Sequence, residues 1–159
     1  MKLNWDLHEL VDFGQRVGSQ KDLDVYLGRA TQEIAKKLHK MLITETPVDW
    51  GDLRAGWKTP ENYKYIIIRN KDGYEVLLVN RVYYARWVND GHKQQPGRFI
   101  PGFYAGGKFR YNPNADGGIV LKRSWDKGRC FVVSSVLKVE NSQAIARIIE
   151  KELRKRLRR

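Results

Sequence analysis

The feature that most constrains the fold is an apolar repeat between residues 20 and 44. Apolar residues recur there at steps of three and four, which places them on one side of an α-helix: Leu23, Leu27, Ala30, Ile34, Leu38 and Met41. Pro47 cannot continue a helix, so this one is expected to stop before it. The repeat predicts a long amphipathic helix with one stripe toward a core.

Two β-rich runs, YKYIIIRN and YEVLLVN, lie on either side of Asp72-Gly73. This dipeptide between alternating runs favours a β-hairpin. Residues 57–59 could begin an earlier strand. The order of elements predicts an α+β fold, in which an antiparallel sheet with a central hairpin packs against the long N-terminal-half helix and a C-terminal helix.

Three shorter helical patterns complete the prediction. Asp6 and Glu9 resemble a capping box for a helix over 6–17. A short helix is expected after Asn80, with Gly91 at its end. The closing helix is expected to begin near Ser134 or Ser135 and to be interrupted at 139–142, because Asn and Ser disfavour helix interiors.

Residues 92–129 have a different composition from the rest of the chain. Gly and Pro breaks interrupt this stretch so often that no helical period survives, although 119–121 could form a short strand. We therefore expect one domain over 1–159, with 92–129 as an extended, mobile loop inserted before the last helix. The apolar runs are far shorter than a membrane span, so no membrane association is expected.

The formal charge of +12 points to a polyanion or an acidic partner. Residues 92–129 hold eight Lys and Arg against two Asp, and residues 151–159 hold six against one Glu. These two segments therefore carry nearly all of the net charge, and the rest of the chain is nearly neutral.

The sequence shows little sign of chemistry. The three histidines are widely separated and Cys130 has no cysteine partner, so we expect no metal, cofactor or catalytic residue. His39 is interpreted as a surface or structural residue, and Cys130 as a small buried hydrophobe. A hydrolase built on Asp49, Asp52 and His92 is a minor alternative. The glycine-rich GFYAGGKF lacks the spacing of a phosphate loop.

The stretch TPVDWGDLRAGW at 46–57 is interpreted as a rigid corner between the long helix and the sheet. Asp49 is expected to cap a short helical turn and Gly51 to give clearance. Leu53 is expected to point inward, Arg54 to form an ion pair, and Trp57 to start the sheet. Each residue then has a structural task and none needs a substrate.

This stretch resembles the TPVDTGxLRxSW signature of a phage tail-component family, the neck or tail-completion proteins of long-tailed bacteriophages and prophages. Two further segments resemble family motifs in the right order: YARWVNDGH, which begins at Tyr84 and contains Gly91, and WDKGRCF, which begins at Trp125 and contains Gly128. The similarity covers about residues 20–157.

The resemblance implies a non-enzymatic virion protein at the neck or proximal tail, present in the host cytoplasm during assembly. Its partners would be other neck and tail proteins, and it would form a homo-oligomeric ring in the particle while being a monomer in isolation. The basic loop could contact packaged DNA non-specifically or dock on an acidic neighbouring ring. Five cations are the candidates for this contact: Arg98, Lys108, Arg110, Lys122 and Arg123.

A rival from another class is a cytoplasmic, non-specific nucleic-acid-binding protein. It would use the same basic loop, with its interleaved aromatic residues, together with the basic C-terminal tail. Its affinity for DNA would fall steeply with salt even for the isolated monomer.

Overall fold

The structure is a computed structural model that describes residues 20–49, 51–71 and 73–157. The helix predicted at 6–17 lies outside the described residues. Within the described ranges, no helix is both long and apolar enough to cross a membrane.

Contacts divide the chain into two compact units, which we describe separately. Unit 1 consists of residues 1–85 and 131–159, and unit 2 of residues 86–130. The expected single domain over 1–159 and the mobility of 92–129 stay predictions.

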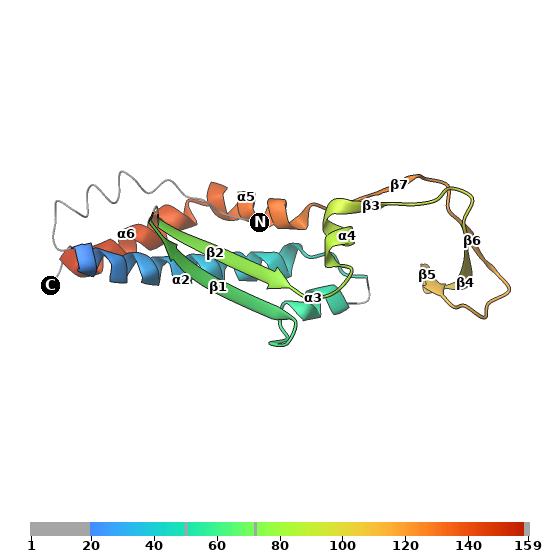
Figure 1. Cartoon of the computed structure of the whole chain (residues 1–159), viewed down its shortest axis with the longest axis horizontal. Coiled ribbons are helices and arrows are strands. Elements are labelled where there is room, and N and C mark those ends of the chain that lie inside the picture. Colours follow the sequence, from blue (N-terminus) through green and yellow to red (C-terminus); the bar gives the residue numbers. More distant parts are fainter. Residues whose placement is uncertain (1–19, 50, 72, 158–159) are drawn as a thin grey trace. The chain divides into compact units, whose positions relative to one another are not determined.

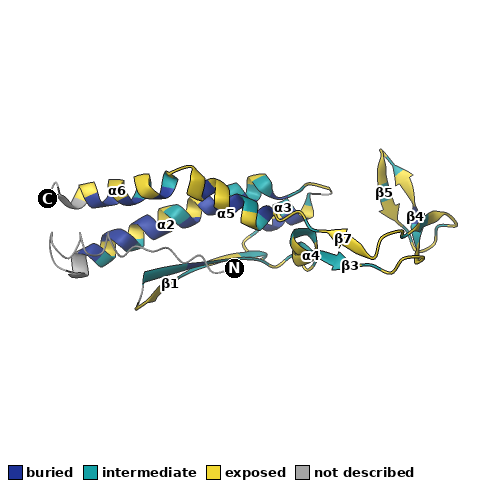
Figure 2. Ribbon diagram, turned by 90° about the horizontal axis from the view of Figure 1, so that it is seen from above, coloured by how far each residue is buried: buried dark blue, intermediate teal, exposed yellow. Residues whose placement is uncertain are grey.

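Three helices form one layer of unit 1: α2 (Gln20–Glu45), α5 (Phe131–Asn141) and α6 (Ala144–Leu157). Both C-terminal helices pack along α2 (Figure 1). The buried residues, dark blue in Figure 2, form continuous stripes on these helices. On α2 they include Leu23, Leu27, Ala30 and Leu38, which confirms the apolar stripe predicted from the repeat.

The closing helix starts earlier than expected and is interrupted as expected. It begins at Phe131 rather than near Ser134, because Cys130 adopts a left-handed backbone with φ 50° that ends the helix toward the N-terminus. The break between α5 and α6 falls at 142–143, where Gln143 has φ 53° and the Ser142 hydroxyl donates to the Val139 carbonyl at 2.8 Å. Local hydrogen bonding by serine thus replaces the helical ladder here.

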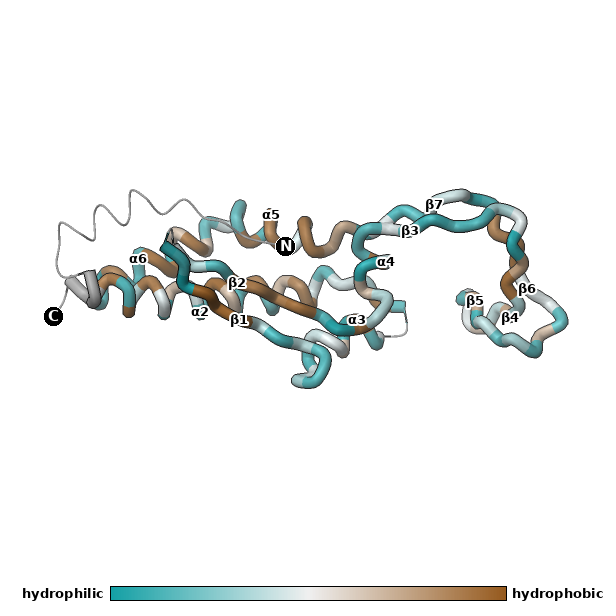
Figure 3. The backbone as a smooth tube through the Cα atoms, in the orientation of Figure 1, coloured by the Kyte–Doolittle hydropathy of each residue, from teal (hydrophilic) through white to brown (hydrophobic). Residues whose placement is uncertain are grey.

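The predicted hairpin is confirmed as β1 (Tyr63–Asn70) and β2 (Gly73–Asn80), paired antiparallel from Tyr63↔Asn80 to Asn70↔Gly73. Hydrophobic residues colour both strands brown in Figure 3. Side chains alternate between the two faces, and Val76 and Tyr74 lie on the face that packs against α2. The Tyr74 hydroxyl donates to the Asp24 carbonyl at 2.8 Å, which fixes the turn end of the hairpin beside the start of α2.

Two short helices flank the hairpin in the sequence. The first, α3 (Asp52–Gly56), lies in the 46–57 stretch, and the second, α4 (Ala85–Asp90), ends at Gly91 as predicted. The strand expected at 57–59 is wrong, because Trp57 is the C-cap of α3 and a turn follows it.

Unit 2 contains regular strands where the sequence predicted a loop. A two-stranded ladder joins β3 (Gly91–Lys93) to β7 (Trp125–Lys127). A three-stranded antiparallel sheet has the order β5-β4-β6, with β4 at Phe99–Ala105, β5 at Lys108–Tyr111 and β6 at Gly118–Val120. The prediction of 92–129 as a loop without regular structure, apart from a strand near 119–121, was wrong. Glycine and proline obscured the period, since they occupy turns and close strand approaches here rather than irregular chain.

Candidate functional site

The stretch at 46–57 is a corner built around Thr46, whose side chain is fully buried. The Thr46 hydroxyl donates to the Leu42 carbonyl at 2.5 Å and accepts the indole N–H of Trp57 at 2.9 Å. Trp57 is itself 4% exposed, so this hydrogen bond is shielded from water. The corner thereby joins the last turn of α2 to the end of α3.

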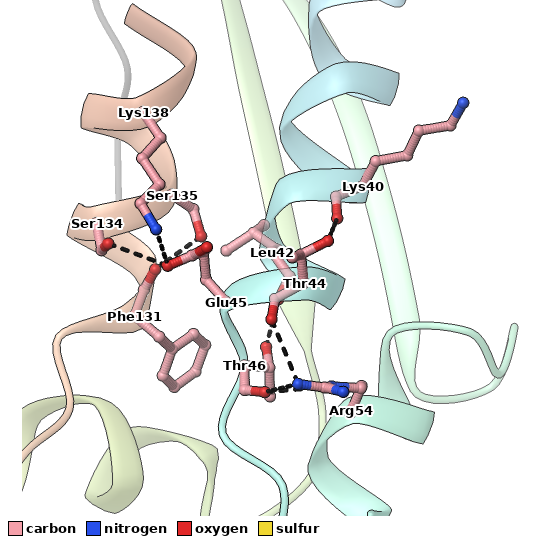
Figure 4. A network of polar contacts seen from close by, with 10 residues as sticks. All are labelled: Lys40, Leu42, Thr44, Glu45, Thr46, Arg54, Phe131, Ser134, Ser135 and Lys138. Atoms are coloured by element: carbon pink, nitrogen blue, oxygen red, sulfur yellow. Dashed lines mark hydrogen bonds and ion pairs between the residues drawn. The ribbon is translucent and has the colours of Figure 1, made fainter. Parts of the chain in front are cut away.

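Arg54 stabilises the same corner through backbone carbonyls, and it forms no ion pair of the kind we expected with any residue that the structure describes. Its Nε and Nη2 atoms donate to the Thr46 carbonyl at 3.2 and 2.8 Å, and Nη2 also donates to the Thr44 carbonyl at 3.3 Å (Figure 4). These are carbonyls at the C-terminal end of α2, where helical partners are missing and the helix dipole favours a cation. Arg54 is therefore a cap for α2.

The start of α3 also differs from the prediction. Gly51, not Asp49, occupies the N-cap position, and its φ of 95° lies in the left-handed region that favours glycine. Leu53 points inward as predicted and is 4% exposed. The corner needs a glycine at 51 for its backbone conformation rather than only for clearance.

An aromatic cluster continues from Trp57 onto the hairpin. His39 stacks on Tyr63 with ring centroids 3.9 Å apart, and its Nε2 lies 2.7 Å from the Trp57 carbonyl oxygen. Burial raises the pKa of Tyr63 to about 12, with a smaller contribution from Tyr65. These contacts support the structural interpretation of His39.

The end of α2 is tied to α5 by Glu45. Its carboxylate accepts from Lys138 Nζ at 2.6 Å and from the Ser134 hydroxyl at 3.3 Å (Figure 4). The hydrogen bond from Lys138 holds the pKa of Glu45 below its usual value. The corner and the first turn of α5 are thus held to the same end of α2.

Asn80 connects the hairpin to α3. Its side-chain amide donates to the Leu53 carbonyl at 3.1 Å, and its Oδ1 accepts the Val82 N–H at 3.0 Å. A β-carbon at Gly56 would lie 2.6 Å from a methyl group of Val82 and 2.9 Å from Asn80 Oδ1, so the small residue permits this contact. Tyr84 follows, and burial is the main cause that raises its pKa.

The second and third resemblance motifs form a single structure in unit 2. Gly91 pairs with Lys127 and His92 with Asp126, and the N–H groups of Arg129 and Cys130 donate to the carbonyls of Val88 and Asn89 at 2.8 and 2.9 Å. The incoming and outgoing chains therefore meet at the end of α4.

Two glycines permit this close approach, which we call the crossing and define by Gly91 and Gly128. A β-carbon at Gly91 would lie 2.6 Å from the backbone nitrogen of Gly128, and one at Gly128 would clash with the carbonyl oxygen of Asn89. The sequence analysis treated the two motifs separately. In the sequence, the glycine in each motif was the only indication that the two motifs lie against each other.

The three-stranded sheet turns at Gly106 and Gly107, which have φ values of 60° and 75° and join Ala105 to Lys108. A two-residue turn with positive φ at both positions suits the twist of a β-hairpin. The glycines of GFYAGGKF therefore serve a hairpin, in agreement with the expectation that they are not a phosphate loop.

Large apolar side chains are exposed on both faces of this sheet. Phe103 pairs with Arg110 and is 49% exposed, whereas the neighbouring Tyr104, on the opposite face, is 68% exposed. Phe99 and Tyr111 are also exposed. Figure 2 shows β5 and much of β4 in yellow for this reason. Unit 2 thus lacks a covered core around its sheet.

The five candidate contact residues all lie in unit 2 and are all exposed. Lys108 and Arg110 alternate on β5, so both share the face that carries Phe103. Arg98 precedes β4, and its carbonyl accepts the Leu121 N–H at 2.9 Å just before Lys122 and Arg123. The structure therefore brings cations and exposed aromatic side chains together on one unit.

The catalytic alternatives gain no support from this geometry. Asp49 and Asp52 belong to unit 1, whereas His92 belongs to unit 2. Cys130 is exposed, so its interpretation as a buried hydrophobe was wrong. Among the described residues, no group of three or more His, Cys, Asp or Glu could hold a metal ion.

Comparison with known proteins gives two matches. The family model described as "Bacteriophage HK97-gp10, putative tail-component" matches residues 12–91, half of the chain. The "Phage-like element PBSX protein XkdI" of Bacillus subtilis (strain 168) is 27% identical over 145 residues, which cover 89% of this chain and 88% of the relative. No solved structure matches the chain. The family match spans α2, the corner and the hairpin and ends at the crossing.

Proposed function

The chain belongs to the HK97-gp10-like family of phage tail components, and on this premise we propose that it joins head to tail, or completes the tail, as a structural virion protein. It would dock as a ring of copies onto neighbouring neck and tail proteins. The XkdI relative, named for a phage-like element, supports a role in a phage or prophage particle. No catalytic step is part of the proposal.

The exposed sheet of unit 2 is the observation that carries this proposal. A three-stranded sheet normally packs at least one face on another layer of the protein. Here Phe99, Phe103, Tyr104 and Tyr111 are each about half exposed or more, on a sheet with no covering layer in unit 2. Exposed aromatic side chains of this kind, on an uncovered sheet, are typical of protein–protein interfaces.

The charge of the same unit indicates the chemistry of the partner. Residues 92–129 carry eight Lys and Arg against two Asp, and the five candidate cations are all exposed. We infer that the partner is a neighbouring neck or tail protein with an apolar patch rimmed by acidic residues. The sheet favours protein over duplex DNA, because burial of aromatic rings contributes little to binding a phosphate backbone.

Complementation of a particle that lacks this protein tests the proposal. Without it, full heads and tails should accumulate unjoined, or tails should terminate at the wrong length, when examined by electron microscopy. The wild-type chain should restore joined particles. Normal particles in the deletion strain would contradict the proposed role.

Paired variants test the docking surface separately. Phe103→Ser with Tyr104→Ser removes one exposed ring from each face of the sheet and should fail to restore particles. The control, Val133→Ser with Leu137→Ser, removes similarly exposed apolar side chains from α5, at 47% and 48%, and should restore them. Circular dichroism must show that both variants keep their helices. Restoration by the sheet variant would exclude this surface as the docking site.

The rival function, a free nucleic-acid-binding protein in the host cytoplasm, makes a different prediction. Deleting such a protein would leave head–tail joining intact. The same deletion strain therefore separates the two hypotheses, whichever surface of the chain contacts nucleic acid.

A further inference from the structure

A hollow of about 520 Å³ lies between α2 and the start of α6 in unit 1. Four cations line it: Lys36, Lys37, Lys40 and Arg147. When net charge is counted along the sequence, the region outside 92–129 and 151–159 is nearly neutral. The fold instead gathers its lysines on one side, because α2 and α6 pack side by side (Figure 1).

A second hollow, of about 490 Å³, continues along α6 and shares Arg147 with the first. It adds three cations: Lys151, Arg154 and Lys155. We call the two hollows together the basic groove. Arg147 lines both hollows, so they adjoin at this residue: the first lies between α2 and α6, and the second lies along α6.

Only part of this positive charge is neutralised within the chain. Ion pairs join Lys36 to Glu33, Arg154 to Glu150 and Lys155 to Glu152. Among the described residues, four groove cations have no side-chain hydrogen bond or ion pair: Lys37, Lys40, Arg147 and Lys151. Glu33 and Glu150 also line the groove, but the cations outnumber them, so the groove keeps a net positive charge that attracts anions.

The cations follow the axes of the helices. Arg147, Lys151 and Lys155 lie one turn apart, which gives a row about 12 Å long at 1.5 Å per residue. The field also reaches across the groove, because the pKa of Glu33 is lowered first by Lys36 and further by Lys151 and Lys155 of α6. The two helices therefore act on one region of space.

We propose that the basic groove binds the phosphate backbone of duplex DNA without sequence preference. A DNA strand carries one charge about every 3.4 Å along the axis, so a row of this length faces three or four phosphates. Ala144 and Ile148 are the only residues with apolar side chains among those that line the groove, and the rest of its apolar surface comes from the stems of charged and polar side chains. In this it differs from the aromatic sheet of unit 2, and a phosphate backbone suits it better than an amphipathic protein surface.

Binding of the full chain to a fluorescein-labelled 20-base-pair duplex tests this proposal by fluorescence anisotropy. Four contacts predict a slope of log K against log salt of about −3.6, so affinity should fall about a hundredfold between 50 and 200 mM NaCl. The groove variant replaces the four unpaired cations with glutamine: Lys37, Lys40, Arg147 and Lys151. A charge-matched control replaces with glutamine four exposed cations of unit 1 that lie outside the groove: Lys58, Lys64, Lys71 and Arg81.

The groove variant should bind at least tenfold more weakly at 100 mM NaCl and lose most of the salt slope. The control should stay within about threefold of wild type, because it has the same net charge but an intact groove. The double variant Lys37→Gln with Lys40→Gln should lose about half of the slope of log K against log salt. This smaller variant keeps the test valid if the fourfold variant fails to fold.

Three results would overturn the proposal. The first is an equal loss in groove variant and control, which would reduce the effect to net charge. The second is a wild-type chain that shows no salt-dependent binding. The third is poly-glutamate that binds the groove as tightly as the duplex, since the site would then suit an acidic polypeptide. None of these results bears on the particle-joining assay, so this inference and the proposed function fail independently.

Discussion

Replacing Thr46 with valine should destabilise unit 1 through a single lost hydrogen-bond partner. Valine has nearly the same shape as threonine, so the change removes the hydroxyl and leaves the buried volume almost unchanged. The indole N–H of Trp57 then lies buried with no acceptor in place of its 2.9 Å hydrogen bond. The Leu42 carbonyl keeps a partner, because it also accepts the backbone N–H at position 46 at 3.0 Å.

The magnitude follows from the orphaned donor. Leaving one buried polar group unsatisfied costs about 1–3 kcal/mol, and we expect about 2 kcal/mol here. With a urea m-value of about 2 kcal/mol/M, the unfolding midpoint should fall by about 1 M. Far-UV circular dichroism is a suitable probe, because the α-helices of unit 1 dominate the signal.

Thr44 provides a matched control on the same helix. Its hydroxyl also donates four residues back, to the Lys40 carbonyl at 3.1 Å, but the residue is exposed. Thr44→Val should therefore change stability by less than about 0.5 kcal/mol. In a Trp57→Phe background, which has no indole donor, Thr46→Val should cost about 1 kcal/mol less than in wild type. Equal costs in the two backgrounds, or equal costs at 44 and 46, would refute this account of the corner.

Further substitutions test other parts of the structure. Gly128→Ala should open the crossing, because its β-carbon would clash with a backbone carbonyl. Limited proteolysis of this variant should then show new cuts confined to 86–130. The control, Gly117→Ala, places its β-carbon at an ordinary 3.6 Å contact and should digest like wild type. An unchanged digest of Gly128→Ala would contradict the crossing. Gly56→Ser should lower the free energy of unfolding by about 1–3 kcal/mol through overpacking, as measured by urea titration, and a neutral result would mean that the contact is loose. Burial raises the pKa of Tyr63 to about 12, whereas the unfolded chain has the ordinary value of about 10. Between these two pH values the folded chain binds more protons than the unfolded chain, so the free energy of unfolding falls as pH rises through this window. Tyr63→Phe should lose less stability than wild type between pH 9 and 11.5, and an equal loss would count against the burial of this hydroxyl.

Local patterns were sufficient to predict the long helix and the hairpin of unit 1. The apolar repeat of α2 and the Asp72-Gly73 turn each act over a few residues, so periodicity and turn chemistry identified the long helix and the hairpin. The corner was also recognised as architecture. Its details were wrong because Arg54 and Trp57 both bind Thr46, a residue eight to eleven positions away that offers no pattern in the sequence.

Unit 2 and the basic groove depend on contacts between distant segments. Gly91 and Gly128 meet only because β3 pairs with β7, and no local period reports such a pairing. The short strands around Gly102 and Gly118 were hidden because glycine usually indicates loops. The groove was missed for a related reason, since Lys37 and Arg147 are far apart in sequence and charge was counted by segment rather than by surface.

The crossing makes the segment beyond it an exchangeable cassette. The chain leaves α4 and returns to α5 through one narrow point, at which the N–H groups of Arg129 and Cys130 bind the carbonyls of Val88 and Asn89. We therefore expect that residues 94–124 can lengthen, shorten or change sequence without altering that junction. The family match stops at Gly91, whereas the XkdI relative aligns over 89% of the chain, so its alignment runs on into this segment.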